Sequence, residues 1–71
     1  MKYTVRYLDW SGNIKTDILT VSETTFDDGT PGFYAHNLLT LGAGKAGRDH
    51  ENAIARLVLA HAKQLLNFIA A

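Results

Sequence analysis

The glycine-rich stretch at residues 41–54, LGAGKAGRDHENAI, has the spacing of a phosphate-binding loop. Gly42, Gly44 and Gly47 spell G-x-G-x-x-G, with which a turn between a strand and a helix holds a dinucleotide pyrophosphate. A dinucleotide fold also needs a second parallel strand after the helix and an acidic residue about 20 positions on, and the sequence provides neither. A Walker loop needs Ser or Thr after its Gly-Lys pair, where this sequence has Ala46. The motif therefore does not indicate a nucleotide-binding fold.

A weaker, anion-binding role stays open for the same stretch. Lys45 and Arg48 flank backbone amides just ahead of an expected helix N-terminus, where free amides and the helix dipole attract phosphate or carboxylate. The alternative is a solvated linker whose glycines permit a sharp turn from strand to helix, and we favour the linker. The possible anion-binding residues are Gly42, Gly44, Lys45, Gly47 and Arg48.

The other groups that could do chemistry do not form a recognisable constellation. His36, His50 and His61 are the only imidazoles, and the chain has no cysteine. Eleven residues of helix would separate His50 from His61 by about 16 Å, too far for two ligands of one metal ion. The paired carboxylates of FDDG, residues 26–29, lack the alternating oxygen ligands of a calcium loop and are typical of a turn. We expect no catalytic residue, no metal and no cofactor, and hence no enzyme.

Composition limits the partners of the chain. Seven basic residues balance seven acidic ones, which argues against a protein whose main role is to coat nucleic acid or an anionic membrane. No apolar run approaches the ~20 residues of a membrane span, and the N-terminal segment lacks the apolar block of a signal peptide. We expect a cytoplasmic protein.

Two segments rich in β-branched and aromatic residues, KYTVRYLD and IKTDILTV, predict a β-hairpin. Gly12-Asn13 suits a two-residue turn between them, and such a turn fixes the register of the strands. One face of the hairpin would then face the core. Its residues are Tyr3, Val5, Tyr7, Ile18 and Thr20.

The rest of the chain is predicted to form turns, a segment that fits either a strand or a helical turn, and a helix. SETTFDDGTPG contains the turn signals Asp28-Gly29 and Pro31-Gly32. FYAHNLLTL fits a strand or a helical turn, and its aromatic start and bounding glycines favour the strand. The expected organisation of this single domain, residues 1–71, is a β-hairpin (1–21), a turn-rich loop (22–32), a third strand (33–41), a glycine-rich joint (42–48) and a helix (49–71).

The C-terminal segment is the clearest signal for secondary structure. From Asp49 to Ala71 the chain has no glycine or proline and is rich in alanine and leucine, with Asp49 as a plausible N-cap and Glu51 in the first turn. Such a helix would be about 33 Å long. The fold class we expect is α+β: a three-stranded antiparallel β-sheet (a βββ meander) with one long C-terminal α-helix packed on it.

This helix would carry two apolar seams, one more than a thin sheet can cover. The first runs through Ile54, Val58, His61, Leu65 and Phe68. The second repeats the four-three spacing one residue later and is typical of close helix packing. Together with the exposed-looking tryptophan of the hairpin end, it gives the interface candidates Trp10, Ala55, Leu59, Ala62, Leu66 and Ile69.

The spare seam predicts a small protein-interaction module, a regulator or inhibitor of a kind common on phages and other mobile elements. It would bind another protein, form a homodimer through its C-terminal helix, or both. The alternative is a nucleic-acid or anion-binding module that uses the glycine-rich joint with Lys45, Arg48, Arg6 and Lys15, which the zero net charge disfavours.

The segment VRYLDWSGN, residues 5–13, resembles the first hairpin of integrase N-terminal domains, which are small DNA-binding domains with a sheet-plus-helix outline. The likeness covers nine of the 71 residues. It implies a helix soon after TVSETT, where this sequence has turn residues, and a basic surplus that this sequence lacks. We therefore assign no residue a role from this resemblance.

Overall fold

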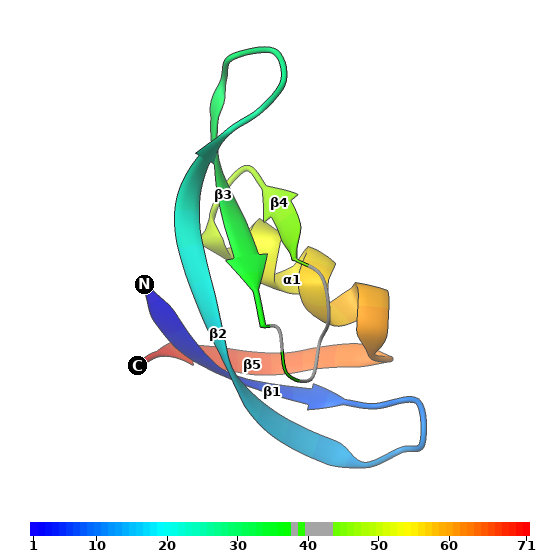
Figure 1. The fold of residues 1–71 in the computed structure, drawn as a ribbon. Helices are drawn as coiled ribbons and strands as arrows, with labels where there is room; N and C mark the ends of the chain where they lie inside the picture. The colour runs from blue at the N-terminus through cyan, green and yellow to red at the C-terminus, as the bar shows by residue number, and fades with distance from the viewer. Residues whose placement is uncertain (38, 40–43) are drawn as a thin grey trace.

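In the part of the chain that the structure describes, five antiparallel strands form one sheet, and one α-helix packs on one face of it (Figure 1). The computed structural model describes residues 1–37, 39 and 44–71. The strands lie in the order β4-β3-β2-β1-β5. The elements along the chain are β1 (Lys2–Leu8), β2 (Ile14–Thr25), β3 (Pro31–His36), β4 (Lys45–Gly47), α1 (His50–His61) and β5 (Gln64–Ala70).

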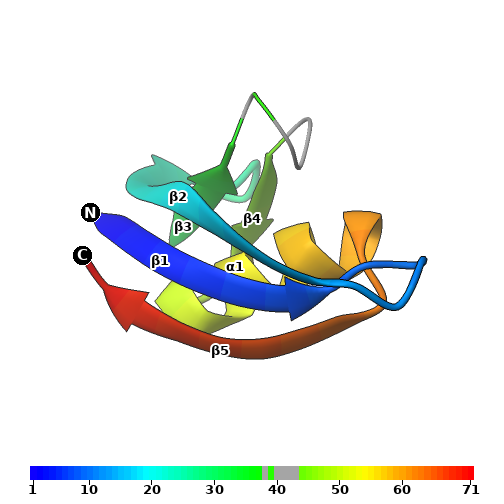
Figure 2. The same ribbon diagram turned by 90° about the horizontal axis from the view of Figure 1, so that it is seen from below.

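The long strand β2 joins two halves of the sheet. Its residues from Ile14 to Thr20 pair with β1, and those from Thr20 to Thr25 pair with β3. The strand bends between these halves, so that they run in different directions (Figure 1). Seen from below, the sheet curls around α1, and the edge strands β4 and β5 both lie beside the helix (Figure 2). The helix therefore fills the concave face and leaves the other face open.

The helix is much shorter than the sequence predicts. It begins after Asp49, whose side-chain oxygen accepts a hydrogen bond from the backbone amide of Asn52 at 2.7 Å, as predicted for an N-cap. It ends at His61 after 12 residues, and Ala62 already has extended backbone angles. The prediction of a helix over 49–71 is therefore wrong, and so is the prediction of a three-stranded sheet, because the described residues form a five-stranded sheet with one short helix.

Residues 64–70 form β5 because β1 offers them a free edge. The two strands pair antiparallel from Tyr3 opposite Ala70 onward, which gives β1 a neighbour on each side. The half-buried side chains of Leu65 and Phe68 pack against the core. Leucine, phenylalanine and isoleucine suit a strand as well as a helix once such a partner exists. Tertiary pairing thus overrides the local helical tendency.

The turn of the first hairpin is longer than the sequence predicts. The Asp9 amide donates to the Asn13 carbonyl at 2.9 Å, and the Gly12 amide donates to the Asp9 carbonyl at 3.2 Å. The Asp9 carboxylate also accepts hydrogen bonds from the amides of Ser11 and Asn13, at 2.9 and 2.8 Å. Gly12 has a φ of 87°, in the left-handed region. This is a type I turn closed by a glycine bulge, in place of the predicted two-residue loop.

The longer turn reverses the faces of β2. Tyr7 pairs with Lys15, whereas a two-residue loop would pair it with Ile18, three positions away. A shift by an odd number of residues exchanges the two faces of a strand. Leu19 and Val21 consequently face the core, at 0 % and 2 % exposed, whereas Ile18 is 56 % exposed.

The second hairpin repeats the same turn. The Phe26 amide donates to the Thr30 carbonyl at 2.8 Å, and the Gly29 amide donates to the Phe26 carbonyl at 2.9 Å. Gly29 has a φ of 86°, matching Gly12 of the first turn. Strand β2 therefore passes directly into β3, without the helix after TVSETT that the integrase resemblance implies.

Strand β3 lies mostly in the segment expected to be a third strand, and β4 lies in the expected joint. The predicted turn-rich loop (22–32) is too long, because residues 22–25 belong to β2 and residues 31–32 belong to β3. β3 ends at His36, within the expected strand 33–41, and residues 38 and 40–43 lie outside the described part of the chain. The three residues Lys45–Gly47 pair with β3 as β4. The linker predicted here is therefore in part a strand.

The core lies between α1 and the concave face of the sheet. The predicted core residues of β1 are buried, but Ile18 and Thr20, predicted to lie beside them, are on the other face of β2. The register set by the first turn thus decides which face of β2 is buried. The buried apolar residues are Tyr3, Val5, Tyr7, Leu19, Val21, Ala35, Ala53, Ile54, Leu57, Val58 and Ala62.

Candidate functional site

The face of the sheet that turns away from α1, which we call the open face, carries exposed isoleucines. Thr4 of β1 stands opposite Ile18 of β2 on one side and Ile69 of β5 on the other. Because residues directly opposite in a sheet share a face, these three form a row across three strands. Ile18 and Ile69 are 56 % and 69 % exposed, and Ile14 near the start of β2 is 59 % exposed. We call Ile14, Ile18 and Ile69 the isoleucine patch.

A polar row divides the isoleucine patch. Arg6 is opposite Thr16 of β2 and Asn67 of β5, so its row lies between the row of Thr4 and the row of Leu8. Leu8 in turn is opposite Ile14, which makes the third row apolar on β1 and β2. Apolar anchors around an arginine are typical of protein–protein interfaces, in which Arg is enriched and Lys and Glu are depleted.

The predicted second helix seam does not exist. Ala55 and Leu59 lie on α1, whereas Leu66 and Ile69 lie on β5, and Ala62 stands between these elements. Ala62 is 1 % exposed and belongs to the core, so it is not available to a partner. Leu59 and Leu66 are 54 % and 40 % exposed. The structure thus keeps three of the predicted residues at the surface but does not bring them together on one helix.

Trp10, the remaining interface candidate, lies in the first turn and is 71 % exposed. The sequence does not indicate Ile14 as a surface residue and predicts Ile18 in the core, because both assignments depend on the register of the first hairpin. Asp9 was the available signal, since an Asp at the start of a turn caps the amides two and four residues on.

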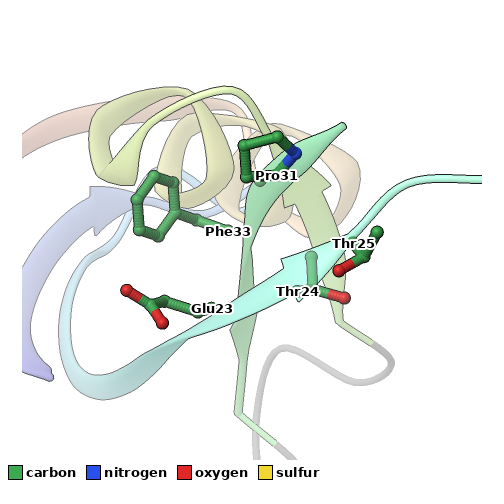
Figure 3. Close-up of a pocket in the computed structure, with 6 residues that line it drawn as sticks. Glu23, Thr24, Thr25, Pro31 and Phe33 are labelled. Atoms are coloured by element: carbon green, nitrogen blue, oxygen red, sulfur yellow. The ribbon is translucent and has the colours of Figure 1, made fainter. Parts of the chain in front are cut away.

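A hollow of about 320 Å³ opens at the β2–β3 hairpin (Figure 3). Figure 3 shows the Glu23 carboxylate and the Phe33 ring projecting to the same side of the two strands, in line with their pairing opposite each other. A second hollow of about 270 Å³ shares these two residues and reaches Met1 and His50. Glu23 and His50 are the side chains here with acid–base capacity.

The His50 ring is part of an aromatic cluster. Its Nδ1 shares a hydrogen bond of 2.5 Å with the Tyr3 hydroxyl, and its ring meets Phe33 edge-on with centroids 4.5 Å apart. Tyr3 also meets Phe68 edge-on, with centroids 5.7 Å apart. These contacts tie the start of α1 to β1, β3 and β5. This arrangement gives His50 a structural role, which no spacing in the sequence signals because 47 residues separate it from Tyr3.

The other two histidines lie elsewhere. His36 at the end of β3 stacks on Tyr34, with ring centroids 5.6 Å apart, and His61 is the last residue of α1. Among the residues that the structure describes, no three His, Asp or Glu side chains group closely enough to hold a metal ion. In the same residues, no helix is long and apolar enough to cross a membrane.

Two glycines of the predicted anion site have a packing role. A Cβ on Gly47 would lie 2.7 Å from both the Ala53 Cα and the Asn52 Oδ1, and one on Gly44 would lie 2.6 Å from the Ala35 carbonyl oxygen. Both glycines therefore permit close approach of two backbones. Gly42, the first glycine of the motif, lies outside the described residues.

The helix N-terminus is already supplied with acceptors. The Asp49 carboxylate accepts from the Asn52 amide, and the Asn52 side-chain oxygen accepts from the Arg48 amide at 3.1 Å. Lys45 and Arg48 are both exposed, on β4 and just after it. An anion here would compete with the carboxylates of Asp49 and Glu51 for the same end of the helix dipole. The geometry favours a packed joint over an anion site.

Comparison of the chain with protein-family models, with curated proteins and with solved structures finds no match.

Proposed function

We propose that the chain is a small protein-interaction module, a regulator or inhibitor, whose contact surface is the open face of the sheet. One observation supports this most directly: Ile18 and Ile69 flank Thr4 in one row and are both more than half exposed. Single exposed apolar side chains are ordinary, but neighbouring ones on one face mark interaction surfaces. A cytoplasmic location is part of the same proposal.

The energy available from the isoleucine patch is enough to matter. Full burial of an isoleucine is worth roughly 1.5–3 kcal/mol, and residues that are little more than half exposed would each gain about 1–2 kcal/mol. Arg6, in the row between, can pair with a carboxylate of the partner and fix its orientation. A glutamate in the patch would have to be buried unpaired, and we expect it to weaken binding at least tenfold.

Affinity capture with matched variants tests the proposal. The tagged chain is incubated with extract of cells that express it, beside Ile18→Glu and a control, Leu59→Glu, which has similar exposure on α1. A partner bound by the wild type and by Leu59→Glu but lost with Ile18→Glu supports the open face as the contact surface. Equal capture by all three proteins contradicts it, and so does a wild-type chain that retains nothing.

A further inference from the structure

The free edges of the sheet differ in length and charge. The edge strand β4 has only three residues and begins with Lys45. Among the described residues, the first half of β2 has no partner strand on one side, but it carries Lys15 and Asp17, and the Asn37 side chain donates to the Ile18 carbonyl there. Short length, charge and local capping are the usual protections of an edge against pairing with another chain.

Strand β5 has none of these three protections. A bulge at Leu66 interrupts its pairing with β1, but the stretch from Asn67 to Ala70 pairs regularly. Strand β5 is seven residues long, its sequence QLLNFIA contains no charge and no proline, and Figure 2 shows it as the outermost strand on its side. Leu66 and Ile69 on it are 40 % and 69 % exposed. A long, apolar, uncharged edge strand is a site where another strand pairs.

The direction of the backbone groups of β5 follows from its pairing with β1. The Ala71 amide donates to the Lys2 carbonyl at 2.8 Å. In an antiparallel pair such hydrogen-bonded positions alternate with positions whose groups point the other way. Ile69 and Asn67 therefore bond toward β1, opposite Thr4 and Arg6, while the N–H and C=O groups of Phe68 and Ala70 point to the outer edge.

We propose that β5 pairs antiparallel with β5 of a second copy of this chain about a two-fold axis, joining two sheets into one of ten strands. An antiparallel pair of identical strands is self-complementary, because each residue that contacts its partner is contacted in return. No like charges meet within the pair, since β5 is uncharged. The two Lys63 residues, one just before each β5, would lie at opposite ends of the antiparallel pair. A parallel pair would instead bring these two positive charges together.

This pairing goes beyond the proposed function, because it uses backbone groups at the edge of the sheet and not the side chains of the open face. It also extends that face. Ile69 of the two copies would lie near the axis on one continuous surface, each in a row with its own Ile18.

The mass of the full chain in solution is the first test. Sedimentation across a wide range of protein concentration should show a dimer for the wild type. Ala70→Pro removes an outward N–H from both copies and should weaken dimerisation at least tenfold, and Ile69→Lys should do the same by adding an edge charge. Ile14→Lys, the same substitution at a similarly exposed site away from β5, should leave the dimer intact.

Amide hydrogen exchange on the unaltered chain provides a test that does not depend on variants. In the dimer the amides of Phe68 and Ala70 should exchange as slowly as that of Ile69. Dilution to the monomer should speed the exchange of Phe68 and Ala70 but not that of Ile69. A wild type that stays monomeric overturns the inference, as does a dimer insensitive to both β5 variants. Fast exchange at Phe68 and Ala70 beside slow exchange at Ile69 also overturns it. If the wild type is a monomer but captures a partner in a way that depends on Ile18, only the dimer inference fails. If the wild type is a dimer but captures no partner, only the proposed function fails.

Discussion

Gly47→Ala should destabilise the fold strongly, because the end of β4 approaches the first turn of α1 too closely for a side chain. The added Cβ would contact the Ala53 backbone nitrogen and lie 2.7 Å from both the Ala53 Cα and the Asn52 Oδ1. Two of these three atoms are backbone of the helix, so relief requires the helix to move away from β4. Such overpacking typically costs about 1–3 kcal/mol.

A second loss adds to the first. The Asn52 side-chain oxygen accepts from the Arg48 amide at 3.1 Å, and moving that oxygen breaks the bond at a cost of about 0.5–1.5 kcal/mol. We therefore expect Gly47→Ala to lower the free energy of unfolding by about 2–4 kcal/mol. For a small domain with a urea m-value near 1–2 kcal/mol/M, the midpoint should fall by about 2 M.

Gly29→Ala is the matched control for this experiment. Gly29 has a φ of 86°, and no atom lies within 4 Å of the place that a Cβ would take, so the change costs only the backbone strain of about 1–2 kcal/mol. Urea denaturation followed by circular dichroism measures both variants. If Gly47→Ala loses no more stability than Gly29→Ala, the close approach of β4 to α1 is wrong. A phosphate-dependent rescue of Gly47→Ala would instead return the glycine motif to an anion-binding role.

Three further changes test other contacts. The Thr30 hydroxyl and amide donate to the Asp28 carboxylate and hold its pKa below the ordinary 3.8, so its contribution to stability is present above that value and is lost as the pH falls through the lowered pKa. An NMR titration of Asp28 should show this, with Thr30→Val raising the pKa, and a midpoint at or above 3.8 in the wild type would contradict it. Asp49→Ala should cost about 0.5–2 kcal/mol of unfolding free energy and Asp49→Asn much less, because asparagine caps equally well; equal losses would refute the cap. Tyr3→Phe should cost about 0.5–1.5 kcal/mol through the lost bond to His50, and an unchanged urea midpoint would show that the bond contributes nothing.

Local signals in the sequence are reliable where the cause is local. Asp49 caps α1, and Tyr3, Val5 and Tyr7 face the core, because capping depends on a few adjacent residues and alternation on one strand. The end of the helix is not predictable in this way. The break after His61 has no glycine or proline, and β5 exists because the distant edge of β1 is available to it.

The candidate site does not emerge from the sequence for a related reason. Gly12-Asn13 suits a two-residue loop on local grounds, but Asp9 closes a longer turn and shifts the register by an odd number of residues. That single difference moves Ile18 from the predicted core to the open face. Both faces of this hairpin carry apolar residues, so composition alone cannot show which face is buried. The turn decides it, because the turn sets the register of the strands.

The place of β5 beside β1 constrains how the chain folds as it is synthesised. Tyr3 leaves the ribosome well before its neighbour in the sheet, Ala70, because the whole of the chain between them is synthesised first. Until then one side of β1 is bare, and Leu65 and Phe68 are missing from the base of the core. Pairing between such distant segments is slow compared with local hairpin formation. A nascent chain that has formed both hairpins and α1 therefore still exposes an unpaired edge of β1 and part of its apolar core until β5 pairs there.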